Sequence, residues 1–112
     1  MSNKTSPEMD EIIKMVETLA GTTTRPMFGY QCYSVGGKFF AGFGKKNNLI
    51  IRLSKDQQSE ALRDKRLKIQ PFSHGAKMGW IELDARSMSN GKAVFDWIEK
   101  GYEHALRLSK KD

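Results

Sequence analysis

The sequence is poor in the residues from which disulfide frameworks, metal clusters and membrane spans are built. Its 112 residues include one cysteine, Cys32, and two histidines, His74 and His104. One cysteine cannot form an internal disulfide, and these three residues show none of the CxxC, HxxxH or HExxH spacings typical of zinc sites. No apolar run approaches the ~18 residues of a membrane helix, and no apolar stretch follows Lys4 as in a secretion signal. We therefore expect a cytoplasmic protein without metal, cofactor or membrane attachment.

Catalytic patterns are equally scarce. Cys32 and His74 could pair as nucleophile and base. However, Cys32 alternates with Tyr33 in a predicted strand, where a buried thiol usually behaves as a small hydrophobic side chain. The pair Gly36-Gly37 lacks the strand–loop–helix context of phosphate-binding loops. The sequence therefore predicts a protein that is not an enzyme.

Hydrophobic periodicity predicts a helix near each end of the chain. Ser6 and Pro7 suit the cap and first position of a helix, and apolar residues then recur every three or four positions as far as Ala20. A last helix is predicted from about 91 to 109. Its apolar residues cover more than one narrow stripe, which indicates either deep burial or the surface of a homodimer.

Between these helices the hydrophobic period changes to two. The alternation predicts strands at 30–35 and 49–53, with another between them that follows the tight turn Gly36-Gly37. A turn is predicted at 45–48. In the middle strand the alternation assigns residues to opposite faces, with Phe39, Ala41 and Phe43 on one and Phe40 and Gly42 on the other.

The second half of the chain predicts a short helix and two more strands. Ser54 followed by Gln57 is the pattern of a capping box, which opens a helix to about Arg63. A strand at 67–72 belongs at a sheet edge because Pro71 lacks an N–H group, and a fifth strand is predicted at 78–83. The order α-β-β-β-α-β-β-α indicates an α+β fold, a two-layer α/β sandwich with helices on an antiparallel sheet. We expect one domain over 1–112, with its core at about 7–109.

Two segments are unusual for a plain scaffold. In the first, Pro26 holds Arg25 in extended geometry, and Met27 and Phe28 either plug the core or serve as adaptable anchors for a partner. In the second, Lys77-Met78-Gly79-Trp80, the tryptophan either fills the space above a strand glycine or helps form a pocket for a peptide or a small acidic ligand. The candidate partner or ligand surface comprises Arg25, Met27, Phe28, Arg52, His74, Lys77 and Trp80.

The net charge of +6 leaves direct nucleic-acid binding as an alternative function. The densest basic stretch supplies the candidate nucleic-acid contacts, Arg63, Lys65, Arg66 and Lys68. No aromatic residues interleave with them to form a stacking platform for single strands, and basic runs of this kind are more often solvated loops. A small-molecule sensor is a further alternative, with a pocket of Arg52, His74, Lys77 and Trp80.

Several motifs, taken in order, resemble the TfoX N-terminal domain family over roughly residues 9–106. They are Met27-Phe28-Gly29, Val35–Gly42, Leu49–Leu53, Pro71-Phe72, Lys77–Trp80 and the helix with Trp97-Ile98. The resemblance implies helices on an antiparallel sheet, similar to YjbR-like and type III secretion-chaperone architectures, which often form dimers. It also implies a regulatory role, because two-domain TfoX/Sxy proteins of bacteria activate competence genes as coactivators beside a cyclic-AMP receptor protein. This chain resembles their N-terminal domain alone, so we expect a non-enzymatic regulator or adaptor that contacts a protein, with the transcription machinery as candidate partner.

Overall fold

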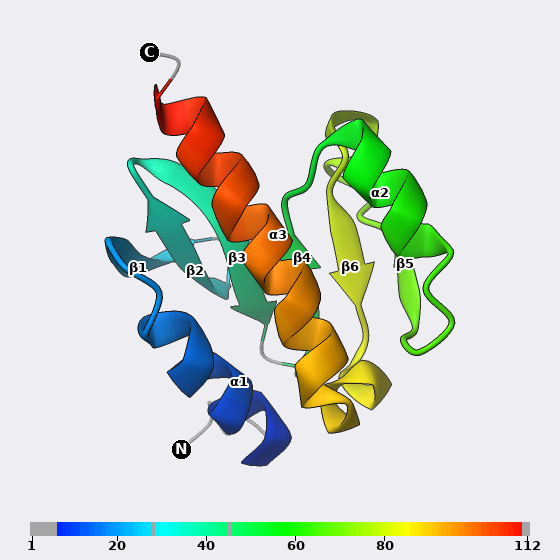
Figure 1. The fold of residues 1–112 in the computed structure, drawn as a ribbon. Helices are drawn as coiled ribbons and strands as arrows, with labels where there is room; N and C mark the ends of the chain where they lie inside the picture. Colours follow the sequence, from blue (N-terminus) through cyan, green and yellow to red (C-terminus); the bar gives the residue numbers. More distant parts are fainter. Residues whose placement is uncertain (1–6, 28, 45, 111–112) are drawn as a thin grey trace.

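A six-stranded antiparallel sheet forms the centre of the computed structural model, which describes residues 7–27, 29–44 and 46–110. Its strands lie in the order β1-β2-β3-β4-β6-β5. The elements are α1 (Pro7–Glu17), β1 (Thr22–Met27), β2 (Tyr30–Val35), β3 (Lys38–Gly44), β4 (Leu49–Ile51), α2 (Lys55–Leu62), β5 (Ile69–Pro71), η1 (Ala76–Met78), β6 (Ile81–Leu83), η2 (Ala85–Ser89) and α3 (Gly91–Lys110) (Figure 1). The predicted α+β class and antiparallel sheet are therefore confirmed.

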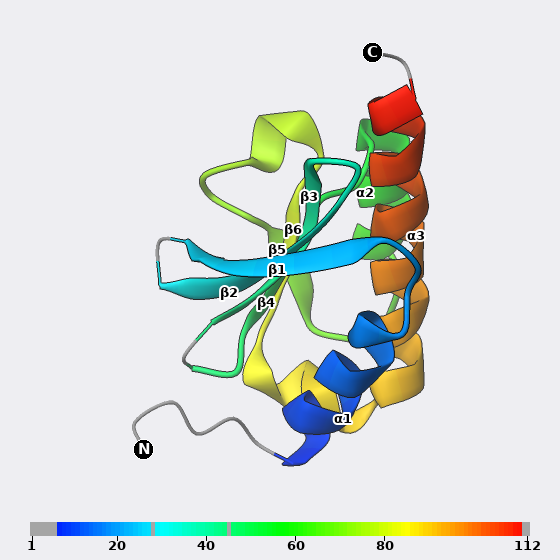
Figure 2. The ribbon, with the colours of Figure 1, turned by 90° about the vertical axis from the view of Figure 1, so that its left-hand side faces the viewer.

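The three α-helices lie together on one face of this sheet (Figure 2). The opposite face carries no α-helix from the described residues. It is flanked instead by the connection between β5 and β6, which contains η1. No helix in the described part of the chain is long and apolar enough to cross a membrane. The two-layer arrangement leaves one face of the sheet open at its centre.

The structure contains one strand more than the sequence predicted. β1 pairs with β2 from Thr22 opposite Val35 to Met27 opposite Tyr30. All its side chains are exposed or half-buried, so the strand shows none of the apolar alternation by which strands are recognised. Backbone pairing at the sheet edge, together with β-branched threonines, accounts for it.

The face assignment predicted for the middle strand is wrong at two residues. Tyr33 pairs with Ala41 and the next residue, Ser34, pairs with Phe39, so Phe40 is the extra residue of a β-bulge. As a result Phe40 turns toward α3, where it is fully buried and its ring meets Tyr102 edge to face at 5.5 Å. Phe39 turns to the open face instead.

The second half of the chain follows its predictions except near Trp80. The capping box of Ser54 and Gln57 is present at the start of α2, and β5 is an edge strand as Pro71 indicated. The strand predicted at 78–83 is wrong in its first half, because only Ile81–Leu83 is extended. Gly79 adopts a left-handed φ of 100°, which ends η1 and reverses the chain before Trp80.

The broad apolar surface of α3 is explained by burial. Trp97 and Ile98 are buried, and Phe95 and Tyr102 pack against the same core. The Tyr102 hydroxyl also donates to the carbonyl of Ala20, at 2.6 Å. α3 thus contacts the sheet and the chain after α1 together, which requires apolar residues around much of its circumference.

Candidate functional site

The open face of the sheet carries a groove of about 770 Å³, which we call the sheet groove. It lies between the turn end of the β1–β2 hairpin and the connection that leads from β5 to β6. Its lining residues are Met27, Tyr30, Cys32, Phe39, Gly42, Ile50, Phe72, Ser73, His74, Trp80 and Glu82.

Strand register assembles the floor of the sheet groove. Cys32 lies opposite Gly42, Gly42 opposite Ile50, and Ile50 opposite Glu82, so four strands contribute one row of side chains. Gly42 keeps this row hollow. A Cβ atom there would lie 3.3 Å from the Phe39 ring and 3.5 Å from the Cys32 sulfur.

Three aromatic rings form the wall on the β6 side. The Phe39 and Trp80 ring centroids lie 5.1 Å apart, and the Phe72 ring is nearly parallel to that of Trp80 at 6.3 Å. The Trp80 indole packs closely against Gly75, since a Cβ atom at this glycine would lie 2.6 Å from the indole. The exposed His74 ring packs edge-on against Phe72. The wall is therefore large, apolar and held in place by its neighbours.

The acidic end of the sheet groove is a hydrogen-bonded cluster around Glu82. One carboxylate oxygen accepts from the Asn48 amide at 2.9 Å, and the other accepts from the Gln70 amide at 3.3 Å. The same Asn48 nitrogen also donates to the Tyr30 hydroxyl, at 3.0 Å. These amides hold the carboxylate in position without neutralising its charge.

Cys32 and His74 line the same groove, yet they do not form an activated pair. Burial raises the pKa of the Cys32 thiol, and the positive charge of Arg25 offsets part of this rise. The thiol therefore stays protonated at neutral pH, whereas a nucleophilic cysteine requires a lowered pKa.

The structure gathers most of the predicted partner or ligand surface at this groove. Met27, His74 and Trp80 line it, and the Arg52 guanidinium lies over the Trp80 ring at 5.9 Å. Arg25 continues the floor row beside Cys32. Lys77 is exposed on η1 and is not part of the lining, and Phe28 lies outside the described residues.

The sequence prediction missed Phe39, Phe72 and Glu82. Phe39 was assigned to the wrong face because a bulge cannot be read from strict alternation. Phe72 and Glu82 flank the predicted residues His74 and Trp80, but only the pairing of β6 with β4 and β5 shows that their segment borders the same groove as Cys32 and Phe39.

Comparison with known proteins agrees with this fold and order of motifs. The family model described as the TfoX N-terminal domain matches residues 14–105. The chain belongs to this family. Among the curated proteins that were compared, none matches.

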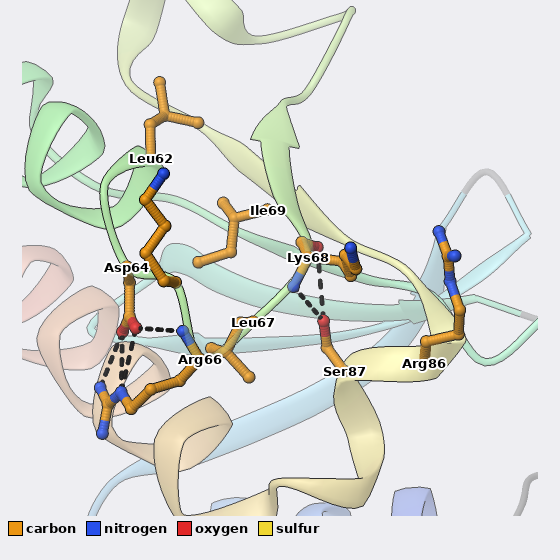
Figure 3. Close-up of a pocket in the computed structure, with 9 residues that line it drawn as sticks. Leu62, Asp64, Arg66, Leu67, Lys68, Ile69, Arg86 and Ser87 are labelled. Atoms are coloured by element: carbon orange, nitrogen blue, oxygen red, sulfur yellow. Dashed lines mark hydrogen bonds and ion pairs between the residues drawn. The ribbon is translucent and has the colours of Figure 1, made fainter.

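In this TfoX N-terminal domain the basic segment after α2 borders a second, smaller hollow of about 300 Å³ (Figure 3). Lys65, Arg66 and Lys68 of the predicted nucleic-acid contacts line it with Arg86, whereas Arg63 does not. The two arginines have acidic partners, since Arg66 pairs with Asp64 and Arg86 with Asp84, each at 2.7 Å. Part of the positive charge that was predicted to contact nucleic acid is therefore neutralised by aspartates within the fold.

Asp64 in this hollow is a structural carboxylate. It accepts hydrogen bonds from the Arg66 backbone and guanidinium, and from the Trp97 indole at 2.8 Å. The Arg66 hydrogen bond is the largest influence and the Trp97 bond adds to it, and together they hold the pKa of Asp64 well below its usual range despite its burial. The ionised carboxylate thus ties the loop after α2 to α3.

We expect Asp64→Asn to lower the free energy of unfolding at pH 7 by roughly 1–3 kcal/mol, since charge-assisted hydrogen bonds are lost. A carboxyl with a lowered pKa in the folded state stabilises the fold fully above its unfolded pKa of about 3.9, and this contribution is lost gradually as the pH falls from that value toward the lowered folded-state pKa. Urea unfolding between pH 7 and pH 2 should therefore show a difference between wild type and variant that is constant near neutral pH and narrows below about pH 4.

The matched control for this experiment is Asp84→Asn, which removes an aspartate–arginine pair on the surface. Its carboxylate is far more exposed than that of Asp64 and has no bond to a buried indole. We expect a smaller loss of stability from it. Equal losses in the two variants, or a pH-independent loss for Asp64→Asn, would contradict the assigned role.

Proposed function

We propose that this chain is a non-enzymatic regulatory or adaptor domain that contacts another protein through the sheet groove. The observation that carries the proposal is the aromatic groove itself, about 770 Å³ on the face of the sheet that no α-helix of the described residues covers. Membership of the TfoX N-terminal domain family supports a TfoX-like regulatory role, with the transcription machinery as the candidate partner. The buried, unpaired Cys32 fits a reducing compartment such as the cytoplasm.

The composition of the groove suits a protein partner. Aromatic and methionine side chains are enriched in the buried centres of interfaces, where they supply large contact areas. Here Phe39, Phe72 and Trp80 form one continuous wall, and Met27 stands on the opposite side of the groove. Arg25 and Lys77 are exposed near it, in the manner of a polar rim.

The chemistry of the groove supports binding over catalysis. Burial raises the pKa of its thiol, Cys32. Its carboxylate, Glu82, is held by two neutral amides, and no hydrogen bond among the described residues links it to His74. This arrangement fixes a shape and a charge rather than preparing a proton transfer.

We expect binding to purified bacterial RNA polymerase or to a cyclic-AMP receptor protein to be weakened at least about tenfold by Trp80→Ala, as for a central aromatic of an interface. His74→Ala should weaken binding less. Because His74 is exposed at the rim of the groove, its removal leaves no cavity in the hydrophobic core. Biolayer interferometry on variants with confirmed thermal unfolding transitions measures both effects.

Met15→Ala is the control for this experiment. Met15 is a partly exposed methionine on α1, which lies on the helix side of the sheet. It should leave binding unchanged. The proposal fails if a partner binds Trp80→Ala and wild type equally, or if Met15→Ala has the larger effect.

A small-molecule sensor is the second candidate, favoured by the volume of the sheet groove. Ligand pockets usually measure about 300–1,000 Å³ and combine an apolar lining with a few polar groups. Trp80 and His74, two of the residues predicted for this function, line the groove, and Arg52 covers one ring of it. A metabolite that raises the unfolding temperature of the wild type but not of Trp80→Ala would favour this candidate.

A further inference from the structure

We propose that the acidic end of the sheet groove receives a basic side chain, arginine or lysine, from the partner protein. This inference rests on the proposed function and names the chemistry that selects the partner. It follows from three features of the groove: a carboxylate with which no described lysine or arginine pairs, aromatic side chains in the same lining, and described arginines that are engaged or distant.

The anion is Glu82, half-buried in the row of residues that forms the groove floor. Its two oxygens accept hydrogen bonds from the amides of Asn48 and Gln70, which are uncharged. None of the described lysines and arginines forms an ion pair with it. Each carboxylate oxygen can accept a further hydrogen bond, so a guanidinium or ammonium group has acceptors available.

Two described arginines belong to the sheet face that carries the groove, and neither pairs with Glu82. The Arg52 guanidinium covers the Trp80 ring. Arg25 occupies the same row as Glu82 but four strands away, which is about 19 Å at the usual strand spacing and beyond the Debye length in physiological salt. The row of paired residues therefore has a basic end on β1, outside the groove lining, and an acidic end on β6, separated by Cys32, Gly42 and Ile50.

The aromatic wall makes the acidic end selective for a cation. Ring faces attract ammonium and guanidinium groups through their quadrupole, and most strongly when water is excluded. Trp80 and Phe39 stand beside Glu82 in the same lining, with centroids 5.1 Å apart. Because the Trp80 ring already has Arg52 over it and Phe72 parallel to it, Phe39 is the ring on which a planar guanidinium can stack while it bonds the carboxylate, and the apolar stem of either basic residue fits against Ile50.

The test is a selection from a random ten-residue peptide library displayed on phage, with the full chain as target. We expect the enriched peptides to share an arginine or lysine at one position. Glu82→Gln should weaken the best peptides by about 5- to 20-fold in fluorescence anisotropy, as expected for a partly desolvated cation site. Glu99→Gln, an exposed glutamate on α3, should leave their affinity unchanged.

A second measurement makes the test independent of variant folding. On the wild-type protein, a peptide in which citrulline replaces the shared arginine, or norleucine the shared lysine, should bind about 5- to 20-fold more weakly. Enriched peptides that lack a basic residue, or that tolerate both citrulline and Glu82→Gln, overturn the cation site and leave the groove as a protein-binding surface. Peptides that bind Phe39→Ala as well as wild type, or a library that yields no enrichment, overturn the groove and the cation site together.

Discussion

Replacement of Phe40 by alanine is expected to lower the free energy of unfolding by about 3–5 kcal/mol, the usual cost of removing a fully buried phenylalanine ring. Phe40 has no exposed surface and packs against Tyr102 of α3. The cavity would open between the sheet and its longest helix, where neighbouring elements cannot easily close it. Urea or guanidinium unfolding, followed by circular dichroism, measures the change.

The neighbouring residue provides the matched control. Phe39 has the same chemistry and the same strand, but its ring lies half-buried in the sheet groove against Trp80. We expect Phe39→Ala to cost only about 1–2 kcal/mol, because less apolar area leaves water when this residue folds. The same variant should lose groove binding that Phe40→Leu, a conservative core change, retains. Equal costs at the two positions would contradict the bulge that separates them.

These two phenylalanines show where sequence reasoning about the fold ends. Helix caps, the double-glycine turn and the capping box at Ser54 are local signals, and the structure has the elements that they predicted. The bulge at Phe40 depends on how β2 and β3 pair, and the neighbouring apolar residues give no local sign of it. β1 was missed for a related reason: an exposed edge strand has no buried face, so its sequence does not alternate between apolar and polar residues.

The candidate site was predictable in part for the same reasons. Trp80 and Met27 stood out because large apolar residues beside glycine or proline are unusual outside a core, and the structure brings both to one groove. Glu82 is one of seven glutamates in the sequence, and no neighbouring residue in the sequence distinguishes it from the others. Its significance comes from the register that sets it opposite Ile50 and beside an aromatic wall.

The groove also depends on backbone geometry that the strand prediction at 78–83 ignored. Gly79 has a φ of 100° and ends η1, and its amide donates to the carbonyl of Ala76. This turn directs Trp80 to the groove instead of extending the strand. The position of the indole is therefore set by a glycine that carries no part of the surface itself.

Gly79→Ala is expected to cost about 3–4 kcal/mol, well above the usual cost of a single substitution. Two effects combine, because a left-handed φ is unfavourable for alanine and because the new Cβ would contact the carbonyl oxygen of Leu53 and lie 2.8 Å from the Ser54 carbonyl carbon. Backbone atoms cannot move aside as a side chain would.

Gly37→Ala is the control, since φ is 79° there but nothing lies within 4 Å of the added atom. It should cost only about 1–2 kcal/mol from the backbone conformation alone. If this turn positions Trp80, Gly79→Ala should lose groove binding under conditions where it remains folded, and Gly37→Ala should keep it. Equal free energies of unfolding for the two variants would contradict the close approach of Gly79 to the chain after β4.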